Sequence, residues 1–214
     1  MNDPEIRNAL IAHLACAFEG TEGTLIVEEI NVCRGRSRVD LAVVSETSLH
    51  GYEIKSRVDS LCRLAHQVSD YTAVFDRVTV VAGVNHLSGL LRDLPPWCGL
   101  LLASRVGGEV VLEEFRPSRT NLHRDRHALA QLLWRDEALA ALKRRGLDRG
   151  VRSKTRTEIW ARMALELTVE ELQHEICYAL RRRKSEWRED ARLRPKVSVA
   201  SGRRRRTRGR RSKR

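Results

Sequence analysis

The chain has 214 residues, 42% of them apolar, and a formal net charge of +12 at pH 7. This length and apolar fraction suffice for one medium α/β domain with an appendage, so disorder along the whole chain is excluded. The five widely spaced cysteines exclude a disulfide framework or a CxxC zinc site, and no apolar run reaches the roughly 18 residues that a membrane helix needs.

The first elements are predicted from hydrophobic period. Residues 4–18 are expected to form an amphipathic helix, with Asp3 as its cap and one apolar face: Ile6, Leu10, Leu14 and Ala17. Three extended runs follow, TLIVEEINV, RSRVDLAVV and LHGYEIK, rich in β-branched residues and separated by short turns. Such runs predict an antiparallel meander.

The next segment returns to helical period at residues 59–75, with Leu61, Leu64, Val68 and Phe75 as candidate core positions. RVTVVAG and GLLLAS then indicate two buried strands, with a short helix near 86–93 between them. The order predicts an α/β fold over residues 1–117, with a mixed central sheet flanked by helices. GEVVLEEF is a candidate edge strand.

From residue 118 the character of the chain changes. Residues 118–192 are helical in period and predict a second, all-helical domain, and residues 193–214 predict a disordered tail. Nine Lys and Arg lie within residues 203–214 without an acid, a composition that attracts polyanions such as nucleic acid, ribosomes or acidic membrane. A tail that is merely solvated is the alternative.

The candidate chemistry lies in GYEIKS. Glu53 and Lys55 are one residue apart, so on a strand both side chains point to the same face. Buried charges need partners, and a divalent cation is one such partner, since carboxylates suit Mg²⁺ or Mn²⁺. Asp40, on the preceding strand, is the second carboxylate, and antiparallel pairing would let both acids converge on one ion. The alternative is a solvated cross-strand ion pair, which is ordinary for an isolated ExK.

Gln67 and Tyr71 follow four residues apart, on one face of the next helix. Glutamine can hold a metal-bound water or a phosphate oxygen, and tyrosine can contact a phosphate or stack on a base. Taken singly, each is more often a helix-surface or core residue. Together with the two acids and the lysine, they form a more specific set.

The series Asp40, Glu53-x-Lys55 and Gln67-x-x-x-Tyr71 resembles the PD-(D/E)xK nuclease superfamily, in particular its branches with a QxxxY signature. Residues 1–115 also resemble a family of uncharacterised bacterial proteins with that fold. The resemblance implies a restriction-endonuclease-like αβββαβ core and Mg²⁺ or Mn²⁺ as cofactor. Val39 stands where the superfamily name has proline.

The same resemblance implies the roles of the site residues. Asp40 and Glu53 are expected to hold the metal, together with the Ile54 carbonyl. Many relatives add a glutamate from the first helix, for which Glu5 is the candidate; Glu29, on the first strand, is a competitor. Lys55 is expected to orient water or offset charge, and Gln67 to position the reactants. Tyr71 and Ser56 are expected to contact the nucleic acid.

The segment EALAALKRRGLDRGVRSKTRTEIWARMALEL resembles a SAP-like DNA-binding module. The residues that fit its pattern are Gly146, Leu147, Gly150, Lys154 and Arg162, of which Lys154 and Arg162 are candidate DNA contacts. A plain helical hairpin that caps the core is the alternative. Trp134, Trp160 and Trp187 are expected to pack rather than to stack on bases.

These observations favour a metal-dependent nuclease that hydrolyses DNA phosphodiester bonds, in repair, recombination or defence. A catalytically inactive nucleic-acid-binding or repair-associated adaptor is the alternative, and a basic-tailed protein of ribosomes or membranes is a third. We expect a cytoplasmic protein with reduced core cysteines, nucleic acid as partner with DNA favoured over RNA, no membrane contact, and a homodimer as one option. Glu53→Ala and Lys55→Ala are each expected to abolish Mg²⁺-dependent cleavage and to leave the fold stable.

Overall fold

The computed structural model describes the backbone of residues 1–193 and the side chains through Arg183. The tail predicted at 193–214 therefore lies almost entirely outside the described residues. The elements of the first part are α1 (Asp3–Ala17), β1 (Leu25–Val32), η1 (Cys33–Gly35), β2 (Ser37–Val44), β3 (Leu49–Lys55), α2 (Leu64–Thr72), β4 (Arg77–Gly83), η2 (Val84–His86), α3 (Leu87–Asp93), β5 (Gly99–Val106) and β6 (Glu109–Arg116). Four further helices follow, α4 (Arg126–Ala130), α5 (Arg135–Arg144), α6 (Arg156–Glu166) and α7 (Val169–Leu193).

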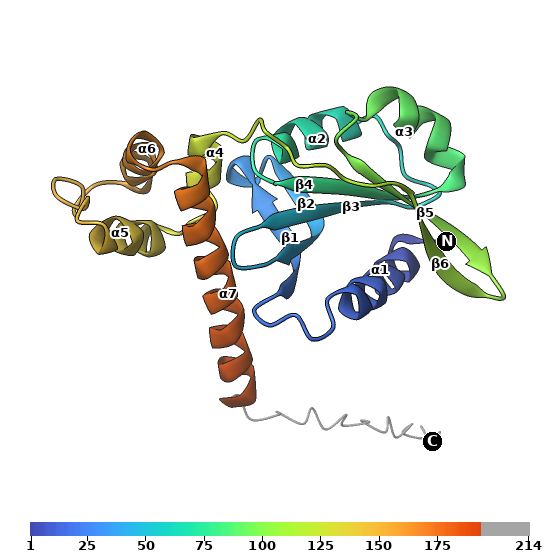
Figure 1. Ribbon diagram of the computed structural model, residues 1–214, viewed down its shortest axis with the longest axis horizontal. Helices are drawn as coiled ribbons and strands as arrows, with labels where there is room; N and C mark the ends of the chain where they lie inside the picture. Colours follow the sequence, from blue (N-terminus) through green and yellow to red (C-terminus); the bar gives the residue numbers. More distant parts are fainter. Residues whose placement is uncertain (194–214) are drawn as a thin grey trace, which may run out of the picture.

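The six strands form one mixed sheet in the order β1-β2-β3-β4-β5-β6 (Figure 1). The pairs β1–β2, β2–β3 and β5–β6 are antiparallel, whereas β3–β4 and β4–β5 are parallel. The predicted meander, the mixed sheet and the edge strand at GEVVLEEF are thus confirmed. Each parallel pair is joined through a helix, because a parallel connection must cross over the sheet.

Helix α1 covers one face of the sheet. Its apolar residues Ile6, Leu10 and Leu14 are buried in a cluster with Leu41 and Ile54. The helix begins one residue earlier than predicted, because Asn2 and Glu5 form the capping box: Glu5 N donates to Asn2 Oδ1 at 3.0 Å, and Asn2 N donates to Glu5 Oε2 at 2.9 Å. The predicted cap Asp3 is therefore wrong, and the predicted core residue Ala17 is exposed.

Helix α2 packs on the opposite face, with Leu64, Val68 and Tyr71 in the main core cluster. It begins five residues later than predicted. Residues 56–59 instead form a turn, in which Asp59 Oδ2 accepts from Ser56 N at 2.7 Å, and residues 59–63 stay outside the helix. This local side-chain bond competes with helix formation and delays the start of the helix.

The helices α4 to α7 share the core of the sheet. Leu129, Ile159 and Leu172 belong to the same buried cluster as Val39 and Val80. The domain boundary near residue 117 stays a prediction, but the apolar core runs across it. Among residues 1–193, no helix is long and apolar enough to cross a bilayer.

A buried polar cluster joins the two halves. Asp76 Oδ2 accepts from Leu49 N at 2.7 Å and also from Gln173 of α7, while Asp76 Oδ1 accepts from Arg124. Asn121 donates to the carbonyl of Thr72 at 2.7 Å. The start of β3 and the end of α2 are thereby tied to the helical region.

The five cysteines are free thiols, as expected. Cys98 and Cys177 are buried, and burial raises the pKa of each to about 12. The expectation of core positions is wrong for Cys16 and Cys62, which are exposed.

Candidate functional site

The candidate site lies where strands β2 and β3 separate. Their pairing ends at Leu41 and Tyr52, although both strands continue. Beyond that pair, β2 pairs only with β1, and β3 pairs only with β4. We call the space that opens between them the fork. Asp40 and Glu53 are the first residues inside it, one from each strand.

An irregularity in β1 shapes the fork on the β2 side. Glu28 pairs with Leu41 and Ile30 pairs with Val39, while Glu29, which has a positive φ of 56°, lies opposite Asp40 outside the ladder. The register is the same on both sides of this unpaired position, so it is not a bulge with an extra residue. The Asp40 carboxylate reaches across the fork, where its Oδ2 accepts from Ile54 N at 2.8 Å.

On the α2 side of the fork, Glu53, Lys55, Gln67 and Tyr71 form one hydrogen-bonded network. Lys55 Nζ donates to Glu53 Oε1 at 2.7 Å and to Gln67 Oε1 at 2.9 Å. Gln67 Nε2 donates to Glu53 Oε1 at 2.7 Å. The Tyr71 hydroxyl donates to Glu53 Oε2 at 2.6 Å and lies 2.8 Å from the Arg38 carbonyl, so it bridges the two strands. The four residues predicted from QxxxY and ExK are thus brought together.

This network is buried, with 3% of the Glu53 side chain and 8% of the Lys55 side chain exposed. The solvated cross-strand ion pair that the sequence left as an alternative is therefore wrong. Burial raises the pKa of Glu53 above its usual value, as does the nearby charge of Asp40, while Lys55 and Tyr71 oppose this shift. Burial also raises the pKa of Asp40, against the effect of the Ile54 N–H and Arg7. Two carboxyls close enough to affect each other are typical of functional sites.

A residue that the sequence did not suggest completes the α1 side. Arg7 Nη2 donates to Asp40 Oδ1 at 2.9 Å, and Arg7 Nη1 donates to the Asp40 carbonyl at 3.1 Å. The first-helix side chain that reaches the acids is therefore a cation. The sequence held no specific signal for Arg7, because helical period alone cannot choose between Glu5 and Arg7 as the residue directed at the site.

The two alternative acidic residues lie elsewhere. Glu5 is held in the capping box and by Arg105 Nη2 at 2.6 Å, on the face opposite to Glu53. Glu29 pairs with Arg38 at 3.3 Å and is half exposed. In this arrangement neither side chain reaches the network around Glu53.

Ile54 and Ser56 also have defined positions. The structure brings the N–H of Ile54, rather than its carbonyl, to Asp40. Ser56 is buried in the turn after β3, where its N–H donates to Asp59 and its carbonyl lies 2.8 Å from His86 Nε2. A direct contact between Ser56 and nucleic acid stays a prediction.

The donor set fits a hard divalent cation. Within the part of the chain that the structure describes, no three His, Cys, Asp or Glu side chains are grouped to hold a metal. Mg²⁺, however, is usually held by one or two carboxylates together with waters and substrate phosphates. Each carboxylate of Asp40 and Glu53 has about four lone-pair positions, of which protein donors use only some. Some lone pairs of both carboxylates are therefore left without a protein donor.

The helical region presents its own candidate surface. Lys154 pairs with Glu158 at 3.1 Å and Arg162 pairs with Glu166 at 3.3 Å, each one helical turn away. Trp160 is buried and donates to the Leu133 carbonyl at 3.0 Å, as a packing residue would. Trp134, in contrast, is 51% exposed. The DNA contacts of Lys154 and Arg162 stay predictions, and the Trp187 side chain lies outside the described part.

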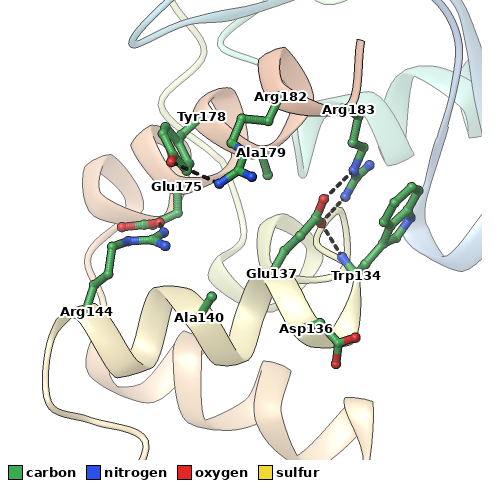
Figure 2. A pocket seen from close by; sticks show the side chains of 10 residues that line it. All are labelled: Trp134, Asp136, Glu137, Ala140, Arg144, Glu175, Tyr178, Ala179, Arg182 and Arg183. Atoms are coloured by element: carbon green, nitrogen blue, oxygen red, sulfur yellow. Dashed lines mark hydrogen bonds and ion pairs between the residues drawn. The ribbon is translucent and has the colours of Figure 1, made fainter. Parts of the chain in front are cut away.

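The described residues of this region line a smaller and a larger hollow. Figure 2 shows the smaller one between α5 and α7, with Ala140 on one side and Ala179 on the other; its volume is about 240 Å³. Two of its arginines face acids, since Arg183 donates to Glu137 and Arg144 pairs with Glu175, while Arg182 lies beside the Tyr178 hydroxyl. The larger groove, of about 770 Å³, runs along β1 and is lined on its other side by Trp134, Arg156 and Arg183.

Comparisons with known proteins place the chain in a family. Protein cII of Enterobacteria phage P4 is 29% identical over 122 residues, which cover 57% of this chain and 41% of that protein. The match thus spans less than half of the relative's length. A solved structure, the SPO1766 protein of unknown function from Silicibacter pomeroyi, is 24% identical, with a TM-score of 0.36 over 54% of this chain and 68% of that one. Residues 1–195 match the family model described as Bacteriophage P4 protein cII, and the chain therefore belongs to that family.

Proposed function

We propose that the protein is a metal-dependent nuclease of the PD-(D/E)xK type that hydrolyses DNA. The observation that carries the proposal is the fork, where Asp40 of β2 and Glu53 of β3 meet beside the buried Lys55, Gln67 and Tyr71. Stability alone does not explain a buried, charged network at the point where two strands separate, since buried ion pairs often stabilise a protein no more than apolar packing does. The element order α1-β1-β2-β3-α2-β4 also agrees with the order that the resemblance implies.

Each residue has a role in this proposal. Asp40 and Glu53 would hold Mg²⁺ or Mn²⁺, which polarises a phosphoryl oxygen and lowers the pKa of bound water. Lys55, anchored by Glu53 and Gln67, has a third ammonium proton to donate to a phosphate oxygen, and its charge offsets the charge that develops there. The amide of Gln67 fixes the orientation of both charged groups. Tyr71 holds Glu53 and keeps the fork open at the Arg38 carbonyl.

The charge distribution supports a nucleic-acid substrate that is bound outside the fork. Residues 1–117 contain 16 Asp and Glu but only 11 Lys and Arg, a net charge of −5. Residues 118–193 contain 18 Lys and Arg against 12 acids, a net charge of +6, and residues 194–214 add eleven Lys and Arg with no acid. An acidic core repels phosphates, so affinity must come from the second half of the chain. The helical region then serves as the DNA-binding part that the SAP-like resemblance suggests.

The experiment is cleavage of labelled single-stranded, duplex and junction DNA, with RNA in parallel, in Mg²⁺, Mn²⁺ and EDTA. The expected result is metal-dependent cleavage of at least one DNA form by the wild-type protein, and its loss in Asp40→Asn with the far-UV spectrum unchanged. Cleavage that persists in Asp40→Asn would contradict the assignment.

A second candidate, an inactive DNA-binding adaptor, is favoured by one observation. Both carboxylates already accept hydrogen bonds from protein groups, Asp40 from Arg7 and Ile54, and Glu53 from Lys55, Gln67 and Tyr71. A folded wild-type protein that binds DNA in EDTA and cleaves none of the substrates in either metal would establish this candidate instead.

A further inference from the structure

The side chain of Arg7 occupies the α1 side of the candidate site. Its Nη2 lies 2.9 Å from Asp40 Oδ1, its Nε lies 3.3 Å from Asp3 Oδ1, and its Nη1 lies 3.9 Å from Glu28 Oε2. Three carboxylates from α1, β1 and β2 thus surround one guanidinium. Only 18% of the Arg7 side chain is exposed, so the contacts with Asp40 are shielded from solvent.

These contacts place a positive charge on the α1 side of Asp40. The guanidinium holds Oδ1 and the Asp40 carbonyl on that side, and the Ile54 N–H holds Oδ2 at the fork. A divalent ion that approached Asp40 from the α1 side would therefore lie against a fixed positive charge. Without Arg7, three carboxylates would face the same space, and two of them, those of Asp3 and Glu28, are exposed enough to adjust.

We propose that Arg7 is a built-in counter-cation that restricts the acid pair to one divalent ion, bound between Asp40 and Glu53. This inference rests on the proposed metal site, and it adds the number of ions and the residue that sets it. Arg7 acts through Asp40, so it is a positioning residue. A one-metal site leaves the leaving-group oxygen without a second ion, so that this oxygen must be protonated by water or by a protein group.

The test is a titration with Mn²⁺, followed by electron paramagnetic resonance of the free ion, on the full-length protein without DNA. The wild-type protein should bind one ion. Arg7→Met keeps an unbranched side chain of similar reach without the charge, and it should bind a second ion. The variant should bind this second ion at least about tenfold more tightly than the wild type does. Removal of a unit charge about 5 Å from a divalent ion has an effect of about this size even with strong solvent screening.

Matched variants separate this effect from a general loss of charge or fold. Arg92→Met removes a guanidinium that pairs with Asp93 on the surface, and it should leave the stoichiometry at one. Arg7→Lys restores a cation and should return the stoichiometry to one. Asp40→Asn in the Arg7→Met background should lose the second ion. Thermal melts of each variant show which proteins are folded before titration.

The outcomes distinguish the two proposals. A wild-type protein that binds two ions, or an Arg7→Met protein that binds one ion with wild-type affinity, would overturn the role of Arg7 while the nuclease proposal stands. A folded wild-type protein that binds no ion would overturn the proposed metal site itself, and the inference with it. If Arg7→Met unfolds, the Arg7→Lys and Arg7→Gln proteins carry the test, since only the neutral glutamine should admit a second ion.

Discussion

Replacement of both charges of the Glu53–Lys55 pair should destabilise the protein less than replacement of Lys55 alone. Lys55 Nζ and Glu53 Oε1 are 2.7 Å apart, and both side chains are nearly inaccessible to solvent. Removal of one partner from a buried pair typically costs about 3–5 kcal/mol, because the remaining charge stays buried without compensation. Replacement of both by neutral groups of similar volume is often neutral, or stabilising by about 1–4 kcal/mol.

The perturbation is therefore a double-mutant cycle with Glu53→Gln, Lys55→Met and the combined variant. Lys55→Met should lose about 3–5 kcal/mol of unfolding free energy at pH 7, because the Glu53 carboxylate then stays buried without its cation. Glu53→Gln should lose less, since burial already favours the uncharged form of Glu53. The double variant should be more stable than Lys55→Met. Urea unfolding followed by circular dichroism measures all four proteins. A Lys55→Met protein within about 0.5 kcal/mol of the wild type, the range of ordinary surface substitutions, would refute the reasoning, as would a double variant whose loss is the sum of the single losses. The same melts test the sequence-based expectation that removal of either charge leaves the fold stable.

Burial raises the pKa of Glu53, so the protonated carboxyl is favoured in the folded state. The stability that this protonation contributes is complete below the pKa of Glu53 in the unfolded chain, near 4.5, and is lost as the pH rises through its pKa in the folded protein. The unfolding free energy of the wild type minus that of Glu53→Gln should therefore fall as the pH rises through this range, and urea melts from pH 4 to 8 measure this difference. A difference that rises with pH would mean that the fold lowers the pKa of Glu53 instead of raising it. Tyr71→Phe removes the hydroxyl that Glu53 and Arg38 share, and it should cost about 1–3 kcal/mol in the same melts; no loss would mean that water replaces it. Deletion of residues 203–214 removes nine cations, so DNA affinity and its salt dependence should fall in a binding series while turnover at saturating substrate is kept; an unchanged salt slope would assign the tail another role.

The local parts of this fold were accessible from the sequence. A period of two placed Glu53 and Lys55 on one face, and a period of 3.6 placed Gln67 and Tyr71 on one side of α2, because side-chain direction follows from the type of element. Short turns between β-rich runs gave the antiparallel meander, which brought Asp40 toward the strand of Glu53. These steps need no knowledge of distant contacts.

The remaining features depend on tertiary contacts. The positive φ of Glu29, opposite Asp40, occurs at a glutamate with no turn signature. The contact between Arg7 and Asp40 joins residues 33 positions apart, and the helical period alone cannot choose between Arg7 and Glu5 as the residue directed at the sheet. The cap of α1 shifted from Asp3 to Asn2 because either residue can cap, and the side-chain bond to Glu5 decided the outcome.

The central claim is that Asp40 and Glu53 together hold one divalent ion in the fork. Crystals grown with Mn²⁺ and measured near the manganese absorption edge locate such an ion directly. We expect one anomalous peak within about 2.0–2.5 Å of a carboxylate oxygen from each residue, the range of bonds from oxygen ligands to hard cations. A peak bound to only one of the two acids, or no peak in the fork at saturating Mn²⁺, would contradict it.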